Sequence, residues 1–416
     1  MARNNCGVYM MNSDTMTIPP GFLAGALHCG IKESGKPDLA MLVSRVPATA
    51  AAVFTTNKIL GAPVVVAKRH IRRGILHACV INSGRANVCT GERGLCDARE
   101  MCSLTAAALR SLALDATANQ ILPASTGVIG RFLPMDALRG GISRLAGALG
   151  DSREHSQEFA RGILTTDTRR KIARAVLSIS GRRIVITGWC KGSGMIAPNM
   201  ATMLAFVATD AALDAAALRA AVRHVAHDTF NCLTIDQHTS TSDMFVCLAN
   251  GLAGNRRITS LSPAWKKFTA ALREVCDSLC RQIAADGEGA TKLVRVFVTG
   301  AVSETEARQA ALAIANSPLV KTAIHGGDPN WGRFVSAAGY SGAKMNPDRA
   351  RCRVGDIEVF KLGRPTEADM AAVEAVMKLS ELDITVDLGA GGKGRCRVYT
   401  CDLSRRYIEI NADYHT

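Results

Sequence analysis

Two kinds of hydrophobic pattern alternate along the chain. Short apolar runs rich in Val and Ile predict β-strands, and longer segments of Ala, Leu and Arg with apolar residues three or four positions apart predict amphipathic helices. The two kinds of segment follow one another from end to end, without an internal repeat or a low-complexity stretch. This order indicates an α/β protein built from layers of helices and sheets.

The predicted elements can be placed by residue range. Strands are expected at residues 39–46, 63–68, 77–84, 182–190, 201–211 and 293–302, and helices at 97–114, 135–149, 211–230 and 303–315. Asp97 is expected to cap the first helix, and Ser303 opens the last one with the sequence of a capping box. The stretches PASTGVIG (123–130) and KGSGMIAPN (191–199) are rich in turn residues and are expected to form loops.

One predicted strand contains a single hydroxyl group at its start. Thr202 lies in the run ATMLAF (201–206), directly after the second of these loops. A buried hydroxyl without a hydrogen-bond partner costs about 1 to 3 kcal/mol, so we expect Thr202 either to be hydrogen-bonded in the strand or to have a chemical role. The spacing alone fits both explanations.

The loop before Thr202 favours the chemical role. Gly192, Gly194 and Pro198 predict a tight backbone, and Ala201 offers an unhindered acyl group. A Thr hydroxyl held against the preceding carbonyl can convert that peptide bond to an ester, which water then opens. The new N-terminal threonine would carry its own base, because an α-amine has a pKa near 7.7 to 8.0, closer to neutrality than a lysine near 10.4.

The sequence around this threonine resembles the signature of a known family. KGSGMIAPNMATMLAF (191–206) is similar to the corresponding block of the ornithine acetyltransferases, also called glutamate N-acetyltransferases, of the cyclic arginine pathway. Eight further blocks agree in the same order: VFTTNK (53–58), NSGRANVCTG (82–91), PASTGVIG (123–130), ILTTDT (163–168), STSDMF (240–245), DGEGATK (286–292), GDPNWGR (327–333) and CDLSRRYIEINADYHT (401–416). The resemblance therefore covers almost the whole chain.

The resemblance implies a processed enzyme with an N-terminal threonine nucleophile. Self-cleavage between Ala201 and Thr202 would give the fragments 1–201 and 202–416, intertwined in the layered α/β fold shared with the β-peptidyl aminopeptidases. Thr202 would take acetyl from N-acetylornithine, release ornithine and pass the acetyl group to glutamate in a ping-pong reaction. No resident cofactor or metal is expected, and use of acetyl-CoA as a further donor distinguishes bifunctional from monofunctional members. A heterotetramer of two fragment pairs is expected by analogy.

Matching the blocks also implies site residues. Thr126 and Gly127 look like the oxyanion hole, and Lys191 would add a positive charge if the fold brings it close. The implied substrate contacts are Thr168, Lys191, Thr202, Glu288, Asn411 and Thr416, with Thr165 or Thr166 as alternatives to Thr168. Lys191 would pair an α-carboxylate and Glu288 would receive the ammonium group of ornithine. Without the resemblance, these residues would be interpreted as turn or solvated loop residues and a frayed terminus.

The chain departs from the family pattern in two blocks. Where the family has Asp-Gly-Asp-Thr-Ser-Thr-Asn-Asp, this chain has DQHTSTSD (236–243), so that Gln237, His238 and Ser242 are substitutions. If the usual glycine has a positive φ, Gln237 must be strained there. Arg85 also replaces an asparagine. These changes are expected to alter substrate preference and rate more than self-cleavage.

Charge and cysteine content narrow the function classes. Lys and Arg exceed Asp and Glu by 14. The basic residues form scattered clusters, such as Arg169-Arg170-Lys171, without interleaved aromatic residues. We expect these clusters on solvated faces. Anionic small molecules such as carboxylate substrates fit this charge, and neither nucleic acid nor a membrane is expected as a partner. The 14 cysteines contain no C-x-x-C pair, so they are expected to be small buried residues in a reducing compartment.

The remaining expectations concern location and alternatives. The chain has no run of 18 apolar residues and no secretory signal, which favours a soluble cytoplasmic protein. The first 17 residues form a loose leader, so a transit peptide is an alternative interpretation of this segment. The first alternative function is an aminopeptidase or amidohydrolase with the same N-terminal nucleophile. The second is a basic nucleic-acid-binding protein without enzymatic activity.

Overall fold

The computed structural model describes residues 2–3, 9–10, 18–197 and 203–413. Three predicted site residues, Ala201, Thr202 and Thr416, lie outside the described residues.

A ten-stranded sheet forms the larger part of the molecule. Its strands run in the order β1 (Ala2–Arg3), β2 (Tyr9–Met10), β7 (Lys171–Ile179), β8 (Arg182–Lys191), β9 (Leu204–Thr209), β10 (Met244–Ala249), β4 (Leu39–Phe54), β5 (Ile75–Arg85) and β6 (Ile121–Val128), and β3 (Phe22–Leu27) pairs with β4. The pairs β9/β10 and β5/β6 are parallel, and β8/β9, β10/β4 and β4/β5 are antiparallel.

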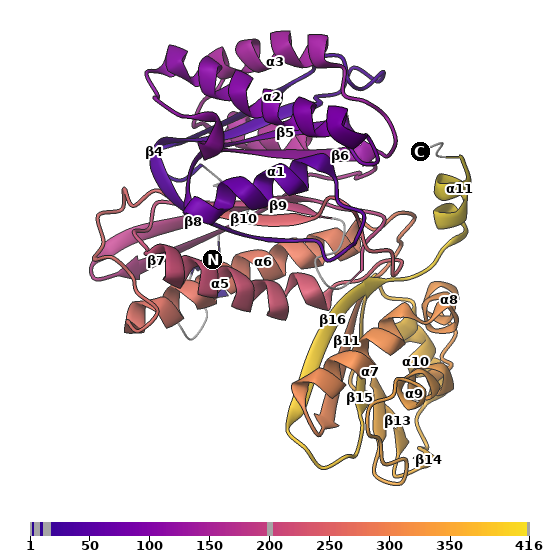
Figure 1. Cartoon of the computed structure of the whole chain (residues 1–416). Helices are drawn as coiled ribbons and strands as arrows, with labels where there is room; N and C mark the ends of the chain where they lie inside the picture. Colours follow the sequence, from indigo (N-terminus) through magenta and orange to yellow (C-terminus); the bar gives the residue numbers. More distant parts are fainter. Residues whose placement is uncertain (1, 4–8, 11–17, 198–202, 414–416) are drawn as a thin grey trace.

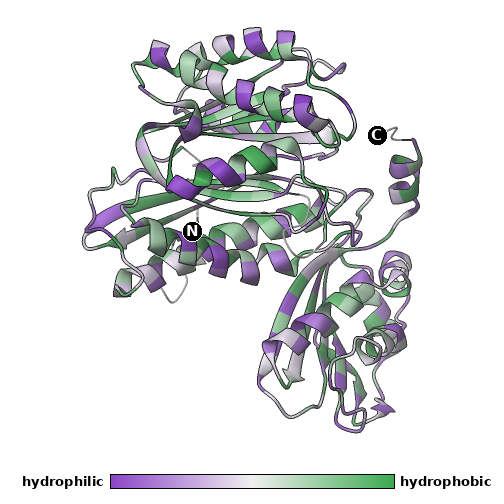
Figure 2. Ribbon diagram, viewed as in Figure 1, coloured by the Kyte–Doolittle hydropathy of each residue, from purple (hydrophilic) through white to green (hydrophobic). Residues whose placement is uncertain are grey.

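The two halves of this sheet pack against each other between two layers of helices. Alternate residues of β4 point to opposite sides: Leu39 and Met41 face α2 (Gly91–Leu109) and α3 (Met135–Gly147), and Leu42 faces a central core with Trp189 and Phe206. On the other side, β7 to β10 pack on α5 (Ala215–Asp228) and α6 (Pro263–Ala285). Figure 1 shows the resulting four layers, from α2 and α3 down to α5 and α6. Figure 2 shows apolar residues gathered on the strands between these layers.

A six-stranded sheet forms a second unit below the first. Its order is β14 (Arg364–Pro365), β13 (Ile357–Lys361), β12 (Arg351–Val354), β15 (Glu381–Asp387), β11 (Leu293–Ala301) and β16 (Gly394–Cys401). The helices α7 (Glu304–Asn316), α8 (Pro318–Gly326), α9 (Trp331–Gly339) and α10 (Met370–Met377) accompany it. The edge strand β16 joins the units, because its Tyr399 and Cys401 belong to the same core as α6. The C-terminal helix α11 (Arg405–Asp413) then returns toward the first unit (Figure 1).

Two shorter helices and several 3-10 turns complete the chain. These are α1 (Ala62–His70) and α4 (Arg153–Gly162), and the 3-10 helices η2 (Ile71–Arg73), η3 (Arg110–Leu112), η4 (Ala118–Gln120) and η5 (Phe230–Cys232). Among the described residues, none of the helices has both the length and the apolar character needed to cross a bilayer.

The predicted class of layered helices and sheets is confirmed, but three local predictions are wrong. Residues 63–68 form part of α1 and not a strand, with Pro63 in the first helical turn, where its missing N–H is not needed. Residues 123–130 mostly form strand β6, paired in parallel with β5. Asp97 does not cap a helix, because α2 begins at Gly91 and Asp97 is buried inside it. By contrast, Ser303 does cap α7 and accepts a bond from Glu306 N at 3.2 Å.

The expected boundary between fragments does not coincide with a boundary between structural units. Strands β9 and β10, which follow position 202, lie in the middle of the large sheet between β8 and β4, which precede it. The fragments 1–201 and 202–416 would therefore share one sheet.

Candidate active site

A buried lysine and a buried threonine meet where β8 and β6 end. Lys191 is the last residue of β8, and its Nζ donates a hydrogen bond to Thr126 Oγ1 at 3.2 Å. The two side chains are only 4% and 5% exposed. Burial lowers the pKa of Lys191, and the nearby Lys171 lowers it further, whereas the carboxylate of Asp167 acts in the opposite direction. Two predicted site residues 65 positions apart are thus in direct contact.

Gly127 follows Thr126 at a point where two backbones approach closely. Its φ is +127°, and a Cβ there would lie 2.3 Å from the carbonyl carbon of Gly84 on β5. Any side chain at this position would therefore push the two strands apart. A small chamber of about 110 Å³ opens beside it, lined by Ala86, Thr126, Gly127, Ile129, Met195, Ser240, Thr241 and Ser242. The two residues expected to form an oxyanion hole both line this chamber.

Glu288 and Asn411 form a second contact of the site. Asn411 on α11 donates its Nδ2 to Glu288 Oε2 at 2.9 Å, across 123 residues of sequence. The carboxylate of Glu288 lies so close to Gly194 that a Cβ on that glycine would be 2.3 Å away. Glu288 also raises the pKa of Lys191 through space. The loop after β8 and the C-terminal helix therefore place an acid and an amide close to the buried lysine.

Thr168 takes part in the site through a buried carboxylate. Its hydroxyl donates to Asp286 Oδ1, and its backbone N–H donates to Asp286 Oδ2 at 3.1 Å. The Ser193 hydroxyl donates to the Asp286 carbonyl oxygen at 2.6 Å. Thr168 is exposed to solvent, and the hydrogen bonds to Asp286 hold it on the side that faces the protein.

A buried ion cluster supports this arrangement. Lys171 Nζ lies 2.6 Å from Asp167 Oδ1 and 2.5 Å from Asp286 Oδ2, and all three side chains are at most 4% exposed. Burial opposes ionisation of Asp167, but Lys171 and Lys191 prevail and lower its pKa to about 2. Asp167 also accepts a bond from Gly192 N at 2.7 Å. The cluster therefore fixes the loop that begins directly after Lys191.

Two carboxylates anchor the chain on either side of residues 198–202. Asp236 accepts from Met195 N at 2.6 Å and from Ile196 N at 2.8 Å, and Asp243 accepts from Met203 N at 2.9 Å. Burial raises the pKa of Asp243 well above its ordinary value. The backbone before and after the expected cleavage point is thus held by one segment, 236–243.

Comparison with known sequences identifies the family of the chain. A sequence model of the ArgJ family matches residues 23–416. The chain belongs to the ArgJ family. The arginine biosynthesis bifunctional protein ArgJ of Symbiobacterium thermophilum is 47% identical over 403 residues, which cover 96% of this chain and 98% of that protein. The family predicted from the sequence blocks is confirmed, and so is the prediction of an acyltransferase of arginine biosynthesis.

Two solved structures are similar to parts of this ArgJ family member. The crystal structure of the arginine biosynthesis bifunctional protein ArgJ from Bacillus halodurans is 43% identical, covers 50% of this chain and 98% of its own, and has a TM-score of 0.49. The crystal structure of ornithine acetyltransferase complexed with ornithine, from Mycobacterium tuberculosis, is 34% identical, covers 46% of this chain and 98% of its own, and has a TM-score of 0.43.

Four aspartates that fix the backbone and the lysine of the site were not identified from the sequence. Asp167, Asp236, Asp243 and Asp286 all lie within or beside the blocks that carry the family resemblance, but none was singled out. Lys171 was expected on a solvated face within a basic cluster, and this is wrong, since its side chain is 1% exposed. The sequence does contain a signal for them, because these aspartates recur beside glycine and threonine. In such turns, backbone N–H groups need acceptors, which aspartate side chains supply.

The departures from the family pattern have visible consequences. Gln237 has a φ of +63°, so it does occupy a left-handed position that favours glycine, and its Nε2 donates to Asn316 O at 2.7 Å. Arg85 donates to Phe132 O, and Ser242 lines the small chamber.

Within the described part of the chain, no group of three or more His, Cys, Asp or Glu is arranged to hold a metal ion.

Proposed function

We propose that this ArgJ family member cleaves itself between Ala201 and Thr202 and then transfers an acetyl group from N-acetylornithine to glutamate through an acetyl-threonine at Thr202. The single observation that carries the proposal is the hydrogen bond from the buried Lys191 to Thr126, which lines the small chamber together with Gly127. The pair of Glu288 and Asn411 supports it. The names of the relatives support substrates of this class, because they are arginine biosynthesis proteins.

Self-cleavage requires only groups that the chain supplies, together with water. The Thr202 hydroxyl adds to the Ala201 carbonyl carbon, the C–N bond breaks, and the nitrogen becomes the free α-amine of Thr202. Water then hydrolyses the ester, which leaves a carboxylate on Ala201 and restores the hydroxyl. The backbone anchors at Asp236 and Asp243 favour this step by limiting movement on both sides of the bond. The central position of β9 and β10 would keep the fragments together afterwards.

Acetyl transfer would follow with the free α-amine as the base. The amine takes the proton of the Thr202 hydroxyl as this oxygen attacks the acetyl carbonyl, and returns a proton to the leaving amine of ornithine. Thr126 Oγ1 accepts a bond from Lys191, so its own proton is free to point at the developing oxyanion, together with the Gly127 N–H. Glutamate then repeats the step in reverse, because its amine attacks the acetyl-threonine ester.

The charged groups around the chamber suit an amino-acid substrate. The ammonium group of Lys191 has three N–H donors, so that donors remain for a substrate α-carboxylate after the bond to Thr126. Glu288, which already accepts one bond from Asn411, is positioned to receive the side-chain ammonium of ornithine. The exposed Thr168 and the C-terminal residue Thr416 complete the proposed substrate contacts.

Three further expectations belong to this proposal. The relatives are named bifunctional proteins, which supports a test of acetyl-CoA as a second donor, and no resident cofactor is needed for the steps above. The fragments 1–201 and 202–416 are proposed to assemble as a heterotetramer of two pairs. The protein is proposed to act in the cytoplasm.

The decisive assay measures ornithine release from N-acetylornithine with and without glutamate. A transferase should release ornithine in proportion to glutamate and form N-acetylglutamate in equal amount. Equal release in both conditions would instead identify a hydrolase of the aminopeptidase type. The Thr202→Ala variant is the control, and it should remain uncut and release no ornithine.

A further inference from the structure

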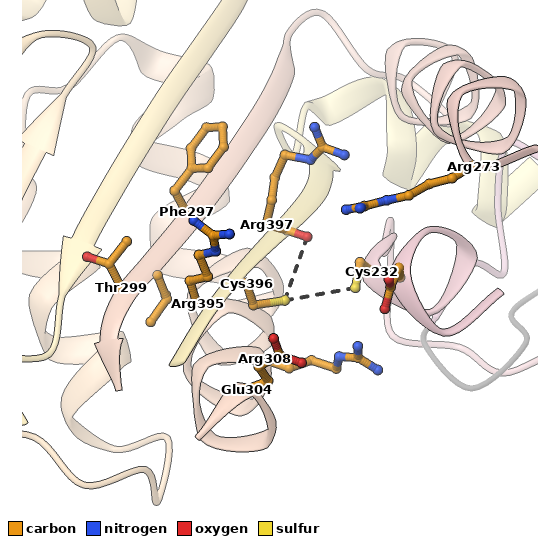
Figure 3. Close-up of a pocket in the computed structure, with 11 residues that line it drawn as sticks. Cys232, Arg273, Phe297, Thr299, Glu304, Arg308, Arg395, Cys396 and Arg397 are labelled. Carbon is orange, nitrogen blue, oxygen red and sulfur yellow. Dashed lines mark hydrogen bonds between the residues drawn. The ribbon is translucent and has the colours of Figure 1, made fainter. Parts of the chain in front are cut away.

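A second cavity, larger than the chamber at Thr126 and Gly127, lies where the edge of the second sheet meets the first unit. Its volume is about 460 Å³. Residues from α6, β11, α7 and the edge strand β16 line it, together with Asp228 and the short helix η5, and Figure 3 shows how their side chains converge. None of the predicted site residues that the structure describes lines this cavity.

Two cysteines face each other in this cavity. Cys232 ends η5, and Cys396 lies on β16, with the two Sγ atoms 3.9 Å apart (Figure 3). A disulfide bond has an S–S length of about 2.05 Å, so an approach of about 2 Å would join them. Both cysteines line the cavity, and Cys232 is 4% exposed, whereas Cys396 is half-buried. The pair therefore combines an accessible thiol with a protected one.

The two thiols differ in acidity. The hydrogen bond between the two thiols and the adjacent Arg308 guanidinium lower the pKa of Cys396, whereas burial and the charge of Asp228 act in the opposite direction. The same hydrogen bond and burial raise the pKa of Cys232. Since the thiolate is the form that attacks a disulfide, Cys396 is the more reactive of the two.

Four arginines give the cavity a positive character. Arg397 is paired with Asp277, and Arg308 lies 2.9 Å from His227 Nδ1. Arg273 and Arg395 are exposed and have no ion pair within the described residues. The lining contains two acids, Asp228 and Glu304. Two guanidinium groups thus remain available for carboxylates of a ligand.

We propose that this cavity is a modification site that binds small anionic disulfides, with Cys396 as the attacking thiol and Cys232 as the resolving thiol. The ligand class is a disulfide that carries carboxylates, for which oxidised glutathione is the probe. This inference does not depend on the proposed acetyl transfer, because both cysteines lie outside that site and on the same side of residue 202.

The chemistry balances with the disulfide as the oxidant. Cys396, as thiolate after loss of its proton to water, attacks one ligand sulfur. The ligand S–S bond breaks, one thiolate leaves and takes up a proton, and a mixed disulfide forms on Cys396. Cys232 then loses its proton, attacks the Cys396 sulfur and expels the second ligand thiolate. The two cysteines are oxidised to one disulfide, and the ligand disulfide is reduced to two thiols.

The test compares an anionic with a cationic disulfide on the full-length protein. Oxidised glutathione and cystamine are each incubated with wild type, and the modified cysteines are identified by peptide mass spectrometry over time. Cys89 and Cys96 are exposed and lie outside the cavity, so they report the intrinsic reactivity of each reagent. We expect Cys396 to react with oxidised glutathione about tenfold faster than these two thiols, and to show no such preference for cystamine.

Variants separate the two steps of the reaction. Wild type should proceed to a disulfide between Cys232 and Cys396, whereas Cys232→Ser should stop at one glutathione on Cys396 and Cys396→Ser should leave Cys232 unmodified. The double variant Arg273→Gln/Arg395→Gln should slow only the anionic reagent, by several-fold. Equal rates at Cys396 for the two reagents in wild type, or modification confined to Cys89 and Cys96, would overturn the proposal without reliance on any variant.

Discussion

The candidate active site and the cavity at β16 both contain clustered cations, but they differ in how those charges are paired. Around Lys191, the ion cluster of Lys171, Asp167 and Asp286 is buried and fully paired. Around Cys396, by contrast, Arg273 and Arg395 stand exposed without an ion-pair partner among the described residues. The first region uses its charges to fix its own geometry, and the second keeps charges available for a ligand.

The largest expected effect is on stability and arises directly from this difference. Lys171→Met would leave two buried carboxylates without their cation, so we expect a loss of about 3 to 5 kcal/mol in the free energy of unfolding. The same change at the exposed Arg273, which has no ion pair among the described residues, should alter it by less than about 0.5 kcal/mol. Urea unfolding of both variants in a Thr202→Ala background, where one uncut chain unfolds, measures the two values. Equal losses of unfolding free energy in the two variants would contradict the distinction between buried, paired charges and exposed charges.

The second prediction concerns the close approach of two strands at the chamber. Gly127→Ala would place a methyl group 2.3 Å from Gly84, so we expect the oxyanion position to be lost. Acetyl transfer should fall by about 100-fold or more. Gly130→Ala is the matched control, because Gly130 also has a positive φ of +77° but has nothing within 4 Å of its Cβ position. Similar activity in the two variants would show that the approach at Gly127 is not needed.

The third prediction is a pH dependence of stability. The pKa of Asp167 in the folded chain is about 2, below the value of about 3.9 expected for an unfolded aspartate. The stabilisation by Asp167 is therefore present above about pH 4 and is lost as the pH falls toward about 2, with a magnitude of about 2 kcal/mol. Asp167→Asn should lose this part of the acid dependence, as measured by urea midpoints across that range. If the pH dependence of stability were unchanged in Asp167→Asn, a group other than Asp167 would be responsible for it.

The smallest expected effect is at Gln237. Its positive φ costs about 1 kcal/mol relative to glycine, and its hydrogen bond to Asn316 returns about as much. Gln237→Gly should therefore change the unfolding free energy by less than about 1 kcal/mol. Gln237→Ala keeps the strain and loses the bond, so it should be less stable than the glycine variant by about 1 kcal/mol in the same urea assay. The reverse order would mean that the backbone is not strained.

Local sequence patterns predicted those parts of the fold that depend on neighbouring residues. The apolar runs predicted the long core strands β4, β5, β8, β9 and β11, and Ser303 predicted the start of α7 because a cap acts within one turn. The same logic failed at residues 63–68, where the β-branched valines predicted a strand. There, Val64 and Ala67 pack together into the central core from one face of α1, so tertiary packing outweighed intrinsic propensity.

The site could be predicted only as far as motifs identify residues one at a time. Thr126 and Lys191 were each identified by resemblance, but their contact depends on the adjacency of distant strands, which no local pattern contains. Lys171 looked like any lysine in a basic cluster, although two aspartates bury it. Cys232 and Cys396 are 164 residues apart, so their spacing predicted two separate buried thiols and not a facing pair.

The most direct test of the central claim is the intact mass of the purified wild-type chain under denaturing conditions. We expect two species, one ending at Ala201 and one beginning at Thr202, and a single uncut species for Thr202→Ala. A wild-type protein that transfers acetyl groups while remaining one continuous chain through this bond would contradict the proposed mechanism.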